Sequence, residues 1–79
     1  MRQVVLYGAP DCHLCEAAGE KLRRVQRLVP FQLTYSNIRE DATLIERYGS
    51  VIPVVTVDGK EAAVSKVTEF HLLKALTLG

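Results

Sequence analysis

The sequence lacks tryptophan and has only one methionine and two cysteines among its 79 residues. A small secreted scaffold held together by disulfides would need several spaced cysteine pairs, so that class is excluded. Ten Lys and Arg residues stand against nine Asp and Glu, which leaves a formal charge of +1. So balanced a charge gives no electrostatic basis for binding nucleic acid or a membrane surface.

Long hydrophobic runs are also missing. No apolar run approaches the roughly 20 residues that a membrane-spanning helix requires. The first run, Val4 to Tyr7, is too short for the apolar core of a signal peptide. The hydrophobic content of 48% and the charged content of 24% are ordinary for a globular protein. We therefore expect a cytoplasmic, monomeric protein without a membrane partner, folded as one domain over residues 1–79.

Hydrophobic patterning predicts a strand and a helix at the start of the chain. The continuous apolar run from Val4 to Tyr7, ended by Gly8, is typical of a strand that is buried on both faces. From Asp11 to Pro30 the period changes to that of an amphipathic helix. The apolar positions that share one stripe of this helix are Leu14, Ala18, Leu22, Val25 and Val29.

A second strand, a short helix and a hairpin are predicted next. Alternation over 31–36 indicates a half-buried strand. A short helix over about 42–48 follows, and Gly49 would close it in a left-handed cap. The dipeptide Asp58-Gly59 predicts a tight primed turn that joins strands over 54–57 and 60–64.

A final helix completes the predicted fold. Ser65 or Thr68 would cap it, and its core-facing positions would be Val67, Phe70, Leu73 and Leu76. The element order is therefore β-α-β-α-β-β-α. A strand–helix–strand opening implies a right-handed parallel crossover, and the hairpin adds antiparallel pairing. The sequence thus predicts an α/β fold, a mixed four-stranded sheet flanked by three helices.

The two cysteines, Cys12 and Cys15, fall between the first predicted strand and the first helix. As a structural staple, a ring this small would contribute only about 2 kcal/mol. At a helix start, however, free backbone N–H groups and the helix dipole lower the pKa of a thiol from about 8.5 into the range of ~3.5 to 7.5. The first cysteine can then attack a substrate disulfide, and the second can release the substrate from the mixed disulfide. This placement favours redox chemistry.

The element order, the Cys12-His13-Leu14-Cys15 motif and Ile52-Pro53 before the hairpin together resemble the thioredoxin fold. With no extra N-terminal strand and helix, the chain is most similar to glutaredoxins and small glutaredoxin-like proteins of bacteria, over essentially its whole length. The resemblance implies that Cys12 is the nucleophile, Cys15 the resolving thiol, and Pro53 a cis-proline that faces the pair. It also implies that the Ile52 backbone pairs with an extended substrate or a thiol cofactor.

The chain departs from the glutaredoxin pattern in three places. His13 stands where a proline usually follows the first cysteine, and Ala9-Pro10-Asp11 stands where a basic residue often precedes the motif. Val64-Ser65-Lys66 replaces the Gly-Gly segment that helps to bind glutathione. We therefore expect a retained dithiol centre and an eroded glutathione site. The expected function is thiol–disulfide exchange on a protein or small thiol, with no bound organic cofactor and with glutathione at most a reductant.

Alternatives remain for the cysteine pair and its neighbours. The two thiolates could hold a metal or an iron–sulfur cluster, shared between two chains because only His13 and His71 could add ligands. The pair could also be incidental in a pure interaction domain. His13, which we group with Ile52 and Pro53 as substrate-binding, could favour the Cys12 thiolate or be a histidine of no consequence. Asp11 is expected to cap the helix, and its charge would oppose the thiolate.

Overall fold

All seven predicted elements form, in the predicted order. The structure is a computed structural model that describes residues 1–78, so Gly79, the last residue of the predicted domain, lies outside the described residues. One short 3-10 helix, η1, occupies the connector after the second strand. The elements are β1 (Gln3–Gly8), α1 (His13–Gln26), β2 (Gln32–Asn37), η1 (Ile38–Glu40), α2 (Ala42–Tyr48), β3 (Val54–Val57), β4 (Lys60–Val64) and α3 (Glu69–Leu78).

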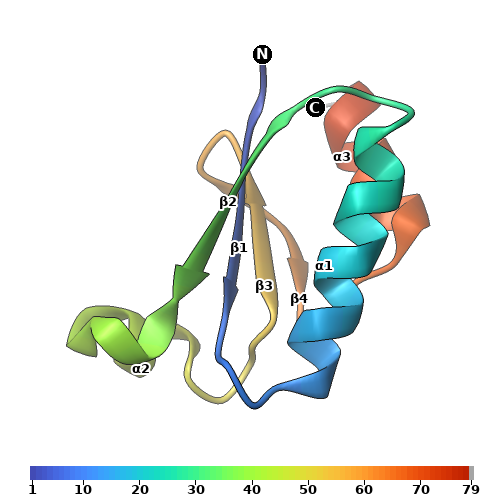
Figure 1. Cartoon of the computed structure of the whole chain (residues 1–79). Coiled ribbons are helices and arrows are strands. Elements are labelled where there is room, and N and C mark those ends of the chain that lie inside the picture. The colour runs from blue at the N-terminus through green and yellow to red at the C-terminus, as the bar shows by residue number, and fades with distance from the viewer. Residues whose placement is uncertain (79) are drawn as a thin grey trace.

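The strands form one mixed sheet in the order β2-β1-β3-β4 (Figure 1). β1 pairs in parallel with β2 and antiparallel with β3, and β3 and β4 form the predicted hairpin. At its turn Asp58 and Gly59 both have positive φ, 50° and 85°, as a primed turn requires. The predicted α/β fold, with three helices around a mixed four-stranded sheet, is confirmed.

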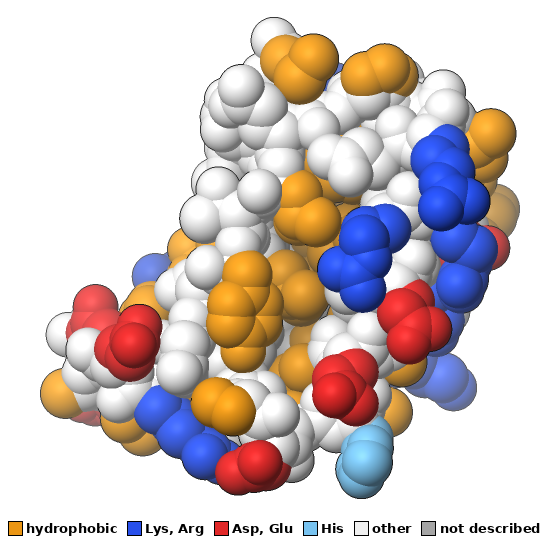
Figure 2. All heavy atoms as spheres, viewed as in Figure 1, with side chains coloured by type: hydrophobic (Ala, Val, Ile, Leu, Met, Phe, Trp, Pro, Cys, Tyr) orange, Lys and Arg blue, Asp and Glu red, His pale blue; other side chains and the backbone are white. Residues whose placement is uncertain are grey.

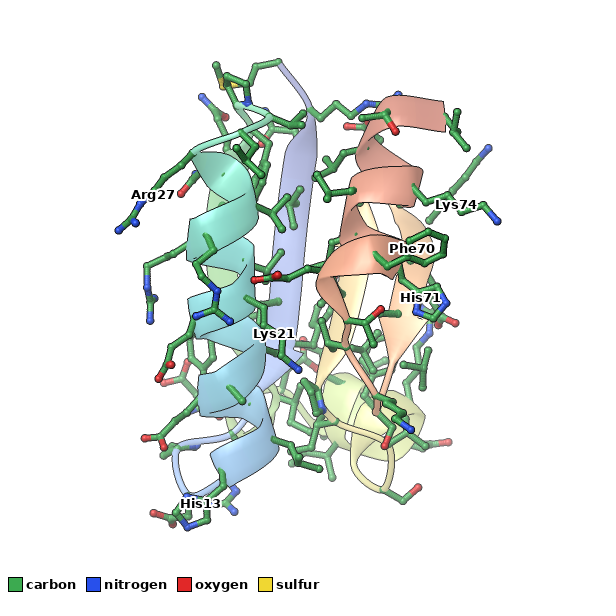
Figure 3. All side chains as sticks on the ribbon, turned by 90° about the vertical axis from the view of Figure 1, so that its right-hand side faces the viewer. His13, Lys21, Arg27, Phe70, His71 and Lys74 are labelled. Atoms are coloured by element: carbon green, nitrogen blue, oxygen red, sulfur yellow. A yellow bond between two sulfur atoms is a disulfide. The ribbon has the colours of Figure 1, made fainter. Side chains whose placement is uncertain are left out.

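The helices cover the two faces of the sheet unequally. α1 and α3 lie side by side on one face (Figure 3) and form the main core with residues such as Leu6, Leu22 and Leu72. Full burial of one such leucine stabilises the fold by about 1.5–3 kcal/mol. On the other face α2 packs Tyr48 against Tyr7, with ring centroids 4.9 Å apart. The main core between α1 and the sheet fixes α1 along its length and so holds its first turn in place.

The predicted inward stripe of α1 is wrong at its first position. Leu14 is 61% exposed, while Cys15 and Gly19 are buried. Cys15 takes the inward position of the first turn because it packs against the end of β1 at Gly8. At the other end α1 stops at Gln26, so Val29 belongs to the connection to β2, but it still packs against the core as predicted.

The predicted core face of α3 is partly wrong. Phe70 is 70% exposed, whereas Leu72 is fully buried. The Oγ1 of Thr68 accepts a hydrogen bond from the backbone N–H of His71 at 3.1 Å, so Thr68 is the cap. With this start, Leu72 and Leu76, four residues apart, face the core and Phe70 points to solvent.

Two smaller predictions also need correction. β1 is not buried on both faces: Val4 and Leu6 are buried, but Val5 and Tyr7 are half-buried, because α2 covers the far face only at one end. Gly49 does not adopt the left-handed conformation, since its φ is −54°. A Cβ at Gly49 would instead collide with the carbonyl oxygen of Ile45.

Candidate functional site

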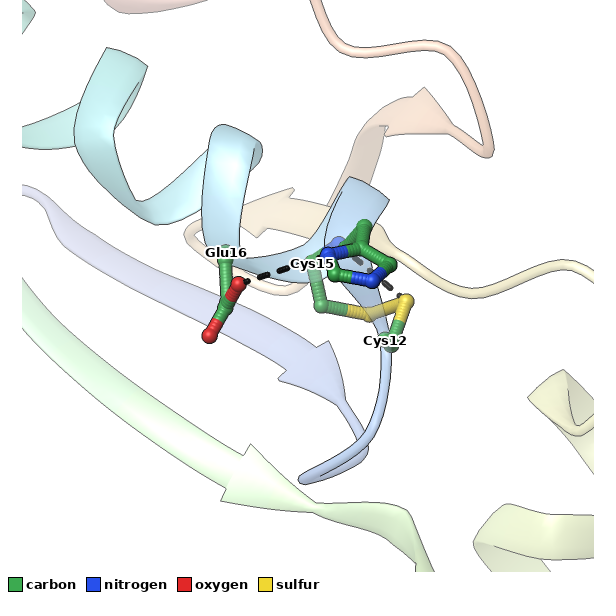
Figure 4. The surroundings of a disulfide bond; sticks show 4 residues. Cys12, Cys15 and Glu16 are labelled. Atoms are coloured by element: carbon green, nitrogen blue, oxygen red, sulfur yellow. Dashed lines mark hydrogen bonds and ion pairs between the residues drawn. A yellow bond between two sulfur atoms is a disulfide. The ribbon is translucent and has the colours of Figure 1, made fainter.

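The cysteine pair sits at the N-terminus of α1, directly beyond the end of β1. Cys12 is the N-cap residue, with an extended backbone (φ −119°, ψ 106°), and its Sγ accepts a hydrogen bond from the backbone N–H of Cys15 at 3.1 Å (Figure 4). The prediction that Asp11 caps this helix is therefore wrong, because the sulfur itself takes that place. One first-turn N–H group that would stabilise a thiolate, that of Cys15, is thus directed at the sulfur of Cys12.

The two cysteines form a disulfide across one turn of helix. Their Cα atoms are 5.2 Å apart, within the usual range for such bonds. Their surroundings differ, because Cys15 is only 4% exposed whereas Cys12 is half-buried. A reagent or substrate can therefore reach Cys12 more easily than Cys15.

Gly8, the last residue of β1, makes room for Cys15. A Cβ at Gly8 would lie 3.0 Å from the Sγ of Cys15 and 3.1 Å from its Cβ. These distances are closer than side chains normally approach, so Cys15 can pack here only because Gly8 has no side chain. From the sequence, Gly8 is only the residue that ends a strand, and its contact with Cys15 is evident only in the structure.

Two ion pairs flank the disulfide. The Nδ1 of His13 lies 3.8 Å from the Oε2 of Glu16, and the His13 side chain extends fully into solvent (Figures 3 and 4). On the other side the Nη1 of Arg39, in η1, lies 3.5 Å from the Oδ2 of Asp11. A basic residue from a distant segment thus contacts the loop before the motif. The sequence could not reveal this pair, since only the fold brings η1 beside the loop before α1.

The Asp11–Arg39 pair should tune the Cys12 thiol. Replacing Asp11 with Asn removes a nearby negative charge and should lower the pKa of Cys12, whereas Arg39→Gln leaves Asp11 uncompensated and should raise it. Because both groups are exposed, each change should be only about 0.5 pH units. The pH dependence of the alkylation rate measures this. In the Asp11→Asn background, Arg39→Gln should have a smaller effect; an equal effect would contradict the coupling.

The segment Ile52-Pro53 lies at the same end of the sheet as the cysteines (Figure 1). The peptide bond between these residues is cis. Val54 pairs with Tyr7 in the β1–β3 ladder, so Pro53 comes next to the end of β1. Pro53 is buried and Ile52 is half-buried. The cysteine pair and Ile52-Pro53, the two parts of the site that the resemblance implied, therefore lie at one end of the sheet.

The segment after β4 is tied to the same loop. The backbone N–H of Ser65 donates a hydrogen bond to the carbonyl of Pro53 at 2.7 Å. Ser65 has a φ of 67°, in the left-handed region that favours glycine. The backbone at Ser65 thus has a conformation that suits glycine, although this position is not a glycine.

Neither a metal-binding cluster nor a membrane-spanning helix is found in residues 1–78. No group of three or more His, Cys, Asp or Glu side chains in this part of the chain is placed to hold a metal ion. None of its helices combines the length and the apolar character needed to cross a bilayer.

The sequence matches the family model of the glutaredoxin-like domain (DUF836) over residues 3–77. Two solved bacterial proteins are similar over nearly the whole chain. An NMR structure of a protein from Nitrosomonas europaea has a TM-score of 0.84 at 29% identity, covering 96% of this chain and 92% of that one. A crystal structure of a protein from X. campestris has a TM-score of 0.83 at 28% identity, covering 96% and 97%.

A third solved structure, of a malarial protein, shares the fold at 16% identity, with a TM-score of 0.69 and coverage of 96% and 92% of the two chains. Comparison with curated proteins gives no match. The comparisons agree with the element order and sheet topology described above.

Proposed function

The chain belongs to the glutaredoxin-like domain family, and on that premise we propose that it is a thiol–disulfide oxidoreductase that works through Cys12 and Cys15. The observation that carries this proposal is the difference between the two sulfurs. Cys12 is accessible and caps the helix N-terminus, whereas Cys15 is buried one turn further on. An attacking thiolate and a protected resolving thiol need these two environments.

The proposed reaction has two steps. The Cys12 thiolate attacks one sulfur of a substrate disulfide; a mixed disulfide forms, and the other substrate sulfur leaves as a thiolate that takes up a proton. Cys15 then loses its proton and attacks the sulfur of Cys12. The mixed disulfide breaks, the substrate leaves as its second thiol, and Cys12–Cys15 becomes the disulfide. The substrate gains two electrons, and an external dithiol or two molecules of a monothiol restore the pair.

The substrate would bind beside the cis peptide bond. We assign the backbone of Ile52 to pair with an extended substrate segment next to Cys12, with Pro53 shaping the contact and His13 at its solvent side. The half-buried position of Ile52 next to the end of β1 supports this assignment. The substrate class is a disulfide-containing protein or a small thiol. The proposed setting is the cytoplasm, because two cysteines in one motif are typical of a catalytic pair and not of a disulfide scaffold.

The test is reduction of insulin by the protein with dithiothreitol as electron donor. The proposal predicts faster precipitation of the insulin chains than dithiothreitol alone produces, and loss of the acceleration in Cys12→Ser. The protein should also be purified without oxygen and analysed for metal. Stoichiometric iron or zinc in a protein that does not accelerate the reaction would instead support a thiolate metal site between two chains.

Glutathione should bind weakly to the reduced protein. Val64-Ser65-Lys66 stands where glutaredoxins have a Gly-Gly segment, so the close main-chain approach that glycines allow is lost. In an NMR titration, the amide signals of Ile52 and Ser65 should move little at sub-millimolar glutathione. Saturable shifts in that range would contradict this expectation and would identify glutathione as a bound substrate.

A further inference from the structure

The two edges of the sheet are built differently. The β4 edge carries Lys60 and Glu61, and its register with β3 shifts between Val55 and Thr56. Charges and irregularities of this kind protect an edge strand from pairing with another chain. β2, the other edge, has the sequence QLTYSN, without a charge, a proline or a register shift against β1. Within residues 1–78 it pairs with β1 alone.

A groove runs along the inner side of this open edge. It has a volume of about 490 Å³ and lies between α1 and β2, with Leu6, Leu33 and Tyr35 among its apolar walls. Tyr35 is 52% exposed, because neither α1 nor α3 extends over the edge strand. Figure 2 shows hydrophobic side chains gathered on this face beside a row of charged residues. The groove reaches Cys15 at one end, but Cys12 does not line it.

From these features we propose that a second copy of this chain occupies the groove, with the two β2 strands paired antiparallel around a two-fold axis at Thr34. The pairing would join the two sheets into one of eight strands. This goes beyond the proposed redox function, and it replaces the monomer expected from the sequence.

The backbone register fits such pairing. The N–H of Gln32 donates to the carbonyl of Arg2, towards β1, so alternation turns the main-chain groups of Leu33 and Tyr35 outward. With the axis at Thr34, Leu33 of one copy faces Tyr35 of the other, and each such pair can exchange two main-chain hydrogen bonds. Residues opposite each other in an antiparallel pair point to the same face. Leu33 and Tyr35 of both copies would therefore fill the joined grooves.

The charges on α1 are self-complementary for an antiparallel neighbour. Glu16 and Glu20 lie in the first half of the helix, and Arg23 and Arg27 in the second. The first three of these residues line the groove. The pairs Glu16–Arg27 and Glu20–Arg23 are both symmetric about one point, between Lys21 and Leu22. An antiparallel arrangement therefore places acid opposite base at every pair, whereas parallel stacking would oppose like charges.

The spacing allows these pairs to form across the groove. If each α1 stays above its own β1, three strand spacings of about 4.8 Å separate the helices by roughly 14 Å. This exceeds the 8–10 Å of directly packed helices, so the space between them must be filled by side chains. In the dimer, Leu33 and Tyr35 would fill the space between the two α1 helices from the sheet side. The long Glu and Arg side chains of the helices would span it on the solvent side.

The test is the mass of the protein by analytical ultracentrifugation, with reductant present so that no intermolecular disulfide contributes. The proposal predicts a reversible dimer whose fraction rises with concentration. Tyr35→Lys places two lysines in the interface and should weaken dimerisation at least tenfold. Val64→Lys puts the same side chain at a similarly exposed site on the other edge strand and should leave the dimer intact. Circular dichroism verifies that each variant is folded.

A charge exchange tests the orientation independently. Glu20→Arg alone or Arg23→Glu alone creates two like-charge contacts and should weaken the dimer about tenfold. The double variant restores opposite charges and should recover to within about threefold of the wild type. A wild type that stays monomeric up to about 1 mM would overturn the proposal and leave the edge to a strand of another protein. A dimer whose dissociation constant is unchanged by Glu20→Arg and by Arg23→Glu would also overturn the proposal.

Discussion

Cys12→Ser should abolish disulfide exchange, whereas Cys15→Ser should still attack a disulfide and then stall. Only Cys12 is both accessible and placed at the free N–H groups of the helix start, so its loss removes the attacking thiolate. Cys15 is 4% exposed, and burial keeps a thiol protonated. Without Cys15 the first step can still occur, but no second thiol can release the substrate.

Mass spectrometry after incubation with an oxidised model disulfide distinguishes the two outcomes. Cys15→Ser should gain the mass of half the disulfide on Cys12, stoichiometrically, and Cys12→Ser should gain almost none. Equal trapping by both variants, or trapping by Cys12→Ser alone, would reverse or remove the assigned roles. Wild-type protein, which can resolve the intermediate, should show only its intramolecular disulfide.

Gly8→Ala should destabilise the oxidised protein by about 1–3 kcal/mol, the usual cost of extra volume in a packed interior. The added Cβ would lie 3.1 Å from the Cβ of Cys15 and 3.4 Å from the Cε1 of Tyr35. The Cβ of Cys15 is fixed by the helix backbone and cannot turn away as the end of a long side chain can. Either β1 or the first turn of α1 must therefore move, and the disulfide moves with it.

Gly19→Ala is the matched control, because it adds the same methyl group at a glycine in the middle of α1. Its nearest neighbour would be a Cδ2 of Leu6 at 3.7 Å, an ordinary contact. Replacing a helical glycine with alanine stabilises a helix by up to about 1 kcal/mol. Guanidinium unfolding of the two variants should therefore give free energies that change in opposite directions. If both lost stability equally, the contact between Gly8 and Cys15 would not be the cause.

The fold was predictable because its signals are local. The turn Asp58-Gly59, the helix over 42–48 and the strand runs are each specified by neighbouring residues, and the order of elements limits the topology. The errors arose where spacing alone does not decide which residues face the core. Leu14 and Phe70 fit their helical stripes by spacing, but packing buries Cys15 and Leu72 instead.

The position of the cysteine pair was predictable from the sequence, but its surroundings were not. The Cys12–Cys15 spacing and its place after a strand identified the pair, and the family resemblance supplied Ile52 and Pro53. The Arg39–Asp11 pair joins segments that only the β1–β2 crossover brings together, so no local pattern indicates it. The packing of Cys15 against Gly8 depends on interatomic distances, which spacing alone does not determine.

The reduction potential of the Cys12–Cys15 disulfide decides whether the pair is redox-active. Equilibration in buffers of defined thiol and disulfide content, followed by quantification of the two forms, gives the value. A catalytic pair should show a reversible two-electron transition between about −120 and −270 mV, the range of exchange catalysts. A potential near −270 mV would indicate a reductant, and one near −120 mV an oxidant. A transition below about −300 mV, typical of structural disulfides, would show that the pair is not catalytic.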